Sequence, residues 1–320
     1  MAAEHDWLYI FLALFVFVEF IALQVFSALA TVPGDPAGLF PNTTEEISDA
    51  YPVQITPAGW TFIIWAIIYI FMLVYVVYIV ACLCRKNKNG PVYLNPPVVP
   101  PAFLAVLSLN MAFNITWLFL FAYAEFVWSL ADSCLLAFSA YICLFLSYKN
   151  VDKYRDVMTA NHRFDLWCNR ILIQNGISIY ATWTSIATLL NLSIALTYNA
   201  GLANRTSCII SLSLLAVELF LYLIIDVFYW DRYLRYTLTV YMTVVWALLG
   251  TLLNNWDRNS TVSLLTASLL VISVACLVFK IVLMLYREPV KAQPSKTKPA
   301  EIVIDYEESL PGDKDEIPLK

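Results

Sequence analysis

Eight long apolar stretches run along the chain, and their number and length restrict its fold more than any other feature. A helix that crosses the hydrocarbon core of a bilayer needs about 20 consecutive apolar residues, and each stretch reaches that length. The stretches are Trp7–Thr31, Pro57–Cys84, Pro101–Tyr123, Phe126–Tyr148, Trp167–Tyr198, Ser207–Tyr229, Tyr233–Leu253 and Thr261–Tyr286. Because 61% of the 320 residues are hydrophobic and only 13% are charged, a water-soluble core could not bury so much apolar surface. The sequence therefore predicts an all-α, polytopic membrane helix bundle of about eight transmembrane helices.

Basic residues fall in every second loop between these stretches, which predicts an orientation. Cytoplasmic loops of membrane proteins carry an excess of Lys and Arg. The basic residues on one side are Arg85, Lys86, Lys88, Lys149, Lys153, Arg155, Arg163, Arg232, Arg235, Arg287, Lys291, Lys296 and Lys298. The loops of opposite parity carry only Arg205 and Arg258. We therefore expect both termini to lie in the cytosol.

Three N-x-S/T sequons lie in the loops that this orientation places outside the cytosol. They begin at Asn42, Asn204 and Asn259, and such sequons are glycosylation acceptors in proteins of the secretory route. Two further sequons, at Asn114 and Asn191, fall inside apolar stretches, where glycosylation is sterically unsuitable. Charge and sequons together predict a multi-pass glycoprotein with its loop sequons outside the cytosol.

The first apolar stretch has a second interpretation, as a cleaved signal peptide. Ala28-Leu29-Ala30 matches the small-residue pattern of a signal-peptidase site, and cleavage would leave the seven helices of a signalling receptor. The leading segment, however, carries Glu4 and Asp6 in place of lysines, and its apolar run of about 25 residues exceeds a usual signal-peptide core. We expect the helix to be retained, with the seven-helix signalling receptor as the alternative.

Three motifs resemble the TspO/MBR family (translocator protein, tryptophan-rich sensory protein). The second stretch begins Pro57-Ala58-Gly59-Trp60-Thr61-Phe62 and continues to Trp65 and Tyr69. The third carries Asn114-Ile115-Thr116-Trp117, and the fifth carries Trp183, Ala187-Thr188 and Asn191. Each motif is similar to a signature of that family, and the three occur in the family's order along the chain.

The resemblance implies a division of the chain, because typical members of the family stop after five helices. Residues 1–198 would be a TspO-like five-helix membrane core, and residues 199–286 a three-helix membrane extension of the kind found in longer relatives. Residues 287–320 are rich in Pro, Lys and Glu and predict a disordered cytosolic tail. The sequons favour the plasma membrane or an endomembrane over the mitochondrial outer membrane of the animal translocator.

The resemblance also implies a binding site for a planar hydrophobic ligand, such as a porphyrin or another lipid-soluble molecule. Its candidate residues are Trp60, Trp65, Asn114, Trp117, Trp183, Ala187 and Asn191. Flat indole faces with an N–H donor suit stacking against a large planar ligand, although the same side chains could simply form the packed core of the bundle. The expected function is a receptor or carrier with no bound cofactor, acting on a hydrophobic small molecule in the bilayer, with a homodimer as a candidate assembly and no nucleic-acid partner.

Two acidic residues lie near the middle of apolar stretches. Glu19 and Glu218 sit roughly 17–18 Å along their helices at the ~1.5 Å rise of each residue, where an ionisable side chain is a functional candidate by default. They could serve a proton-coupled transporter, or act as neutral acids that tie two helices together. Asp226 and Lys280 lie closer to the cytosolic ends, and we expect these two side chains to snorkel.

The sequence contains no recognisable catalytic constellation. His5 and His162 are the two histidines of the chain, and both lie outside the apolar stretches, which argues against a histidine-ligated metal or a serine–histidine hydrolase. The eight glycines form neither a phosphate-binding loop nor a dinucleotide fingerprint. We therefore expect a protein that is not an enzyme.

Overall fold

The computed structural model describes residues 6–88 and 90–287. Within them, seven helical stretches are long and apolar enough to cross a membrane, which confirms a polytopic helical membrane bundle. The helices that begin and end near the expected positions are α1 (Trp7–Leu29), α4 (Pro101–Ala122), α5 (Phe126–Lys153), α9 (Asn204–Ile224) and α12 (Thr261–Arg287). Local signals explain several of these ends. The Asp6 carboxylate accepts the backbone N–H of Tyr9 at 3.0 Å, and Pro101 occupies the first turn of α4.

The fifth expected stretch is one long helical run with two π-helical segments. It consists of α7 (Arg163–Cys168), η2 (Asn169–Gln174), α8 (Asn175–Ile194) and η3 (Ala195–Asn199). A third π-helical segment, η4 (Ile225–Tyr229), extends α9. Such segments widen a helix locally and often occur at functional positions, and η4 carries the acidic residue Asp226.

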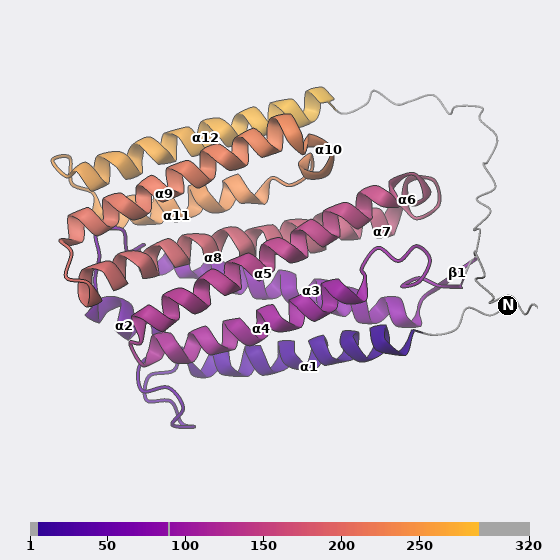
Figure 1. Cartoon of the computed structure of the whole chain (residues 1–320), viewed down its shortest axis with the longest axis horizontal. Coiled ribbons are helices and arrows are strands. Elements are labelled where there is room, and N and C mark those ends of the chain that lie inside the picture. Colours follow the sequence, from indigo (N-terminus) through magenta and orange to yellow (C-terminus); the bar gives the residue numbers. More distant parts are fainter. Residues whose placement is uncertain (1–5, 89, 288–320) are drawn as a thin grey trace, which may run out of the picture. The chain divides into compact units, whose positions relative to one another are not determined.

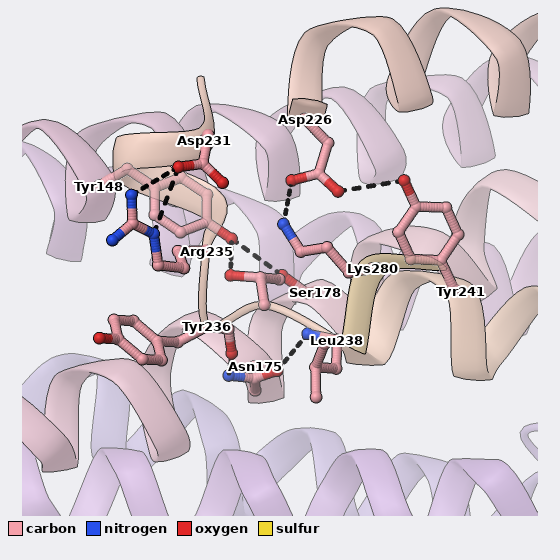
Figure 2. A network of polar contacts seen from close by, with 11 residues as sticks. Tyr148, Asn175, Ser178, Asp226, Asp231, Arg235, Tyr236, Leu238, Tyr241 and Lys280 are labelled. Carbon is pink, nitrogen blue, oxygen red and sulfur yellow. Dashed lines mark hydrogen bonds and ion pairs between the residues drawn. The ribbon is translucent and has the colours of Figure 1, made fainter. Parts of the chain in front are cut away.

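The seventh expected stretch is shorter than the sequence predicts. In place of Tyr233–Leu253, the structure has the short α10 (Asp231–Leu234) and then α11 (Thr239–Asn255), of 17 residues, or about 25 Å. The side chain of Asn175 explains the break between them. Its amide donates to the carbonyl of Tyr236 at 2.9 Å and accepts the N–H of Leu238 at 3.2 Å, so these backbone groups are not available to a continuous helix (Figure 2).

The second stretch also begins later than Thr56 and Pro57 predict. Its first turn is the 3-10 helix η1 (Gly59–Ile63), which continues into α3 (Ile64–Cys84). Ala58, directly before Gly59, is extended, and the segment around it is hydrogen-bonded to α11. The backbone N–H of Ala58 donates to the carbonyl of Gly250 at 3.1 Å, and the Asn255 amide donates to the carbonyl of Thr56 at 2.8 Å.

The long helices lie side by side, with the connecting elements gathered at the two ends of the bundle (Figure 1). Helix α8 is central, since it contacts α3, α5, α9 and α11. Helix α4 packs between α1 and α5. The short helix α2 (Thr44–Ala50) lies at one end; α6 (Arg155–Asn161), α7 and the two-residue strands β1 (Lys86–Asn87) and β2 (Gly90–Pro91) belong to the other.

The two ends differ in chemistry as the sequence predicts. At the α2 end, the Asn42 amide donates to the carbonyl of Ala122, and the Asn204 amide to that of Pro52. At the other end, Arg232 pairs with Asp152 at 2.6 Å. The loop sequons and the basic loops therefore lie at opposite ends.

The described helices form one compact unit that extends to Tyr286. The expected boundary at residue 198 stays a prediction, since helices from both sides of it pack on α8. Apart from Arg287, the expected disordered tail 287–320 lies outside the described residues.

Candidate functional site

A narrow aromatic cavity lies between α8 and the helices α3, α4, α9 and α11. Five aromatic side chains line it together with apolar residues of α8, α9 and α11. These aromatic residues are Phe62, Trp65, Trp117, Phe121 and Trp183. The volume accessible to the centres of water molecules is about 60 Å³. This is well below the ~300–1,000 Å³ of typical ligand pockets, so the cavity is narrow.

The three indoles of this cavity form two parallel walls and one perpendicular wall. The rings of Trp65 and Trp117 have centroids 6.4 Å apart and planes inclined by 30°. The ring of Trp183 lies 6.4 Å from that of Trp65, at an interplanar angle of 89°. The ring of Phe62 packs edge-on against Trp183, with ring centroids 6.1 Å apart. A flat ligand that separated Trp65 from Trp117 would therefore stack on both and meet Trp183 at its edge.

Polar donors inside this cavity have no partner. The indole Nε1 atoms of Trp117 and Trp183 and the amide Nδ2 of Asn191 are buried without a hydrogen bond among the described residues. All three side chains line the cavity. Because a buried donor without an acceptor costs about 1–3 kcal/mol, an acceptor placed in this space would stabilise these three groups.

The structure brings five of the seven candidate ligand residues together and leaves two outside. Trp65, Trp117, Trp183, Ala187 and Asn191 line the cavity, and the last three are spaced by four residues on one face of α8.

The two remaining candidates have other neighbours. Trp60 is 44% exposed and its ring packs edge-on against Trp246 at 4.9 Å. The amide of Asn114 is fully buried and donates to the Tyr180 hydroxyl at 2.8 Å.

Sequence reasoning missed the contribution of α9 and α11 to this cavity. Helix α9 supplies Ser211, Leu212 and Leu215, and helix α11 supplies Ala247, Leu248 and Thr251. The ligand residues that the resemblance implied came from the second, third and fifth helices, although the seventh helix also carries a motif of longer relatives, Val245-Trp246-Ala247-Leu248. The pairing of Trp246 with the first motif, through a bond from its Nε1 to the carbonyl of Thr61 at 2.9 Å, depends on a contact that no sequence spacing reveals.

The two mid-membrane glutamates have different surroundings. Glu19 is half-buried on α1, close to Ser108 of α4, and its Oε2 is buried without a hydrogen bond among the described residues. Glu218 lines a second, larger cavity between α5, α8 and α9. A further acid, Asp132 of α5, is 7% exposed and its Oδ2 has no partner among the described residues; the sequence analysis did not single it out.

Asp226 and Lys280 do not snorkel, which corrects the sequence expectation. Their side chains are 0% and 1% exposed and form a buried ion pair between η4 and α12. The second carboxylate oxygen of Asp226 accepts a hydrogen bond from the Tyr241 hydroxyl at 3.1 Å, so each charge has a partner (Figure 2). The pairing replaces the aqueous solvation that snorkelling would have supplied.

The loop sequons differ in accessibility. Asn42 and Asn259 are exposed. Asn204 is half-buried, and its amide both donates to the carbonyl of Pro52 at 3.0 Å and accepts the N–H of Gln54 at 3.0 Å.

Comparison with known proteins agrees with the resemblance in the three motifs. A family model described as TSPO-like protein matches residues 11–285. No curated protein and no solved structure matches the chain. The matched range extends from α1 to α12 and includes every motif residue and every residue that lines the aromatic cavity. The chain is therefore a multi-pass membrane protein that belongs to the TSPO-like family.

Proposed function

We propose that this protein is a receptor or carrier that binds a planar, lipid-soluble ligand in the aromatic cavity. One observation carries the proposal: the unpartnered N–H donors of Trp117, Trp183 and Asn191 surround a space walled by indoles. Such a space suits a conjugated ring system whose edge bears carbonyl, carboxylate or ring-nitrogen acceptors. A porphyrin has both properties.

The small volume of the cavity defines what binding requires. A space of about 60 Å³ accommodates a few water molecules at most, so a porphyrin-sized ligand must displace side chains. The half-buried Trp65 of α3 and Ile186 of α8 are among the wall residues that such a ligand would displace.

The proposal also covers the functional class of the protein, the membrane in which it resides and its oligomeric state. The chain acts as a binding protein or carrier, not as an enzyme, and it resides in the plasma membrane or an endomembrane with both termini in the cytosol. The packing of α1 favours a first helix that is not cleaved from the protein, because Ala13, Val16, Phe20 and Leu23 are buried in the bundle. The seven-helix receptor alternative would expose that surface of α3 and α4. The homodimer stays a hypothesis that size measurements in detergent can test.

Tryptophan fluorescence of the purified protein tests ligand binding directly. Protoporphyrin IX should quench it saturably, and Trp183→Leu should weaken binding about threefold to tenfold, as the loss of one aromatic contact of ~0.5–1.5 kcal/mol predicts. Ala187→Leu should also weaken binding, because it fills space beside Trp183. Trp256→Leu is the matched control, since Trp256 is 57% exposed outside the cavity. Absence of saturable quenching, or equal affinity in all three variants, would contradict the proposal.

A further inference from the structure

A groove larger than the aromatic cavity opens toward the lipid between α5, α8 and α9. Its volume accessible to the centres of water molecules is about 730 Å³, within the ~300–1,000 Å³ of typical ligand pockets. The lining is mostly apolar, and several lining residues are exposed on the bundle surface, namely Phe138, Phe145, Leu221 and Ile225. Trp230 stands at the α10 end, 5.9 Å from the ring of Phe145. The groove has the size and the surface of a site for one amphiphile that enters from the bilayer.

Two polar groups without protein partners lie on its α9 wall. Glu218 lines the groove and is exposed on the bundle surface, and no hydrogen bond or ion pair holds its carboxyl group among the described residues. Cys134 and Tyr141 of α5 line the same groove. The Tyr222 hydroxyl is buried and also without a partner in the described part of the chain. The hydroxyl of Tyr141 differs, because it pairs with the Ser185 hydroxyl at 2.6 Å.

The C-terminal end of the same helical run shows how this protein satisfies an intramembrane acid. Glu218 and Tyr222 are four residues apart on α9 and share one helix face, and Asp226 follows in the π-helical segment η4. Asp226 has its counter-ion within the chain, the ammonium of Lys280, and a hydroxyl from Tyr241 (Figure 2). Glu218 has no ammonium partner among the described residues, and the Tyr222 hydroxyl lies one turn away on α9. A carboxyl group and a hydroxyl therefore face the groove together, as the carboxylate of Asp226 and the hydroxyl of Tyr241 do at Lys280.

We infer that the groove binds a lipid-soluble primary amine with a single alkyl chain. Its ammonium group donates to the Glu218 carboxylate and to the hydroxyl oxygen of Tyr222. Its chain lies along the apolar wall formed by Phe138, Ile142 and Leu219. Charge complementarity selects this class. A carboxyl group in hydrocarbon is neutral unless a cation pairs with it, and an uncharged amine can accept the carboxyl proton to form that ion pair. The bilayer delivers such an amphiphilic amine laterally to the open side of the groove.

This inference does not rest on the proposed function of the aromatic cavity. The two cavities share only the wall residues Ile186, Leu189 and Leu215, and Glu218 and Tyr222 belong to the groove alone. Loss of porphyrin binding and loss of amine binding can therefore be observed separately.

Binding of tritiated dodecylamine to the full-length protein in phosphatidylcholine nanodiscs tests the inference. Saturable binding is expected, with dodecanol, which lacks the charge, competing at least tenfold less well. Glu218→Gln should weaken dodecylamine binding at least tenfold and Tyr222→Phe about threefold. Glu218→Asp keeps the charge and should stay within about threefold of the wild type, which provides a second variant should Glu218→Gln fail to fold.

Two matched controls complete the experiment. Glu19→Gln removes the other mid-membrane glutamate, which lies outside the groove on α1, and Trp183→Leu alters the aromatic cavity; both should bind dodecylamine as the wild type does. Equal competition by dodecanol, or unchanged affinity in a folded Glu218→Gln protein, would overturn the inference and leave Glu218 as a neutral acid at the lipid surface.

Discussion

Asn191 shows how a residue can be unfavourable for stability and still belong in this fold. Its amide is 2% exposed and its Nδ2 has no partner among the described residues, whereas the amide of Asn110 donates to the carbonyl of Leu136 and to the hydroxyl of Ser139, both at 2.8 Å. Both residues are buried amides on membrane helices, so hydrophobicity alone does not distinguish them. Their hydrogen bonds do.

Replacement of these two amides by leucine should therefore have opposite effects on stability. Asn191→Leu removes an unpaired donor that costs about 1–3 kcal/mol, so it should raise the melting temperature in detergent while weakening protoporphyrin binding. Asn110→Leu removes the two hydrogen bonds that this amide donates across α4 and α5, to the Leu136 carbonyl and the Ser139 hydroxyl, so it should lower the melting temperature. Thermal unfolding and fluorescence quenching on the same preparations measure both. A lower melting temperature for Asn191→Leu would show that its amide is satisfied in the native protein.

Gly250 of α11 is required by the close approach of the η1 segment. A Cβ at this position would overlap the Thr61 side chain, and the Gly250 carbonyl accepts the N–H of Ala58 at 3.1 Å. Gly250→Ala should thus destabilise the protein by ~1–3 kcal/mol, the usual cost of overpacking. Thr61→Ala removes the overlapping atoms and should restore most of the loss in the double variant. Melting temperatures of the two single variants and the double variant measure this, and additive losses would contradict a direct clash.

At the scale of elements, the sequence predicted helices well and their ends less well. Apolar run length and the Pro101 signal are local properties, which is why α4 and α12 begin where expected. The start of η1 and the break before α11 depend on partners far along the chain, Gly250 for Ala58 and Asn175 for Leu238. A window of sequence contains no information about either partner.

The pairing of η4 with α12 was unpredictable for the same reason, since 54 residues separate Asp226 from Lys280. The pair matters because α12 is the least buried of the apolar spans, with 17% of its most apolar part inside the bundle against 61% for the span that contains α8. We infer that the ion pair is a principal anchor of α12.

Removing one charge of this pair should detach α12 more than removing both. Asp226→Asn leaves the Lys280 ammonium buried without its counter-ion, which typically costs about 3–5 kcal/mol. The double change Asp226→Leu with Lys280→Met replaces the pair by apolar side chains and should recover most of that stability. Limited proteolysis after Arg287 and thermal unfolding in detergent report the effect. If the single variant unfolds like the wild type, other contacts hold α12.

The whole molecule explains why the candidate site was only partly predicted. The fourfold spacing of Trp183, Ala187 and Asn191 indicates a shared face of one helix, and the structure places all three on the aromatic cavity. Which helices complete the cavity is a property of the bundle. Helices α9 and α11 close it, so the stretch expected as an extension is part of the pocket, while Trp60 lies against Trp246 on the outside.

The topology of the whole chain gives the final prediction. Basic loops and loop sequons lie at opposite ends of the bundle. The exposed Asn42 and Asn259 are better glycan acceptors than the half-buried Asn204, whose amide is hydrogen-bonded to both Pro52 and Gln54, whereas that of Asn42 is hydrogen-bonded to Ala122. Glycosidase should therefore shift the mobility of the wild type, and Asn42→Gln or Asn259→Gln should each reduce the shift. Asn204→Gln should leave the shift unchanged.

A tag at the C-terminus should be reached by antibody only after the membrane is permeabilised, because the positive-inside rule assigns the basic end to the cytosol. Detection of that tag on intact cells would reverse the orientation. A glycan that depends on Asn204 alone would contradict the assignment of Asn42 and Asn259 as the acceptor sites.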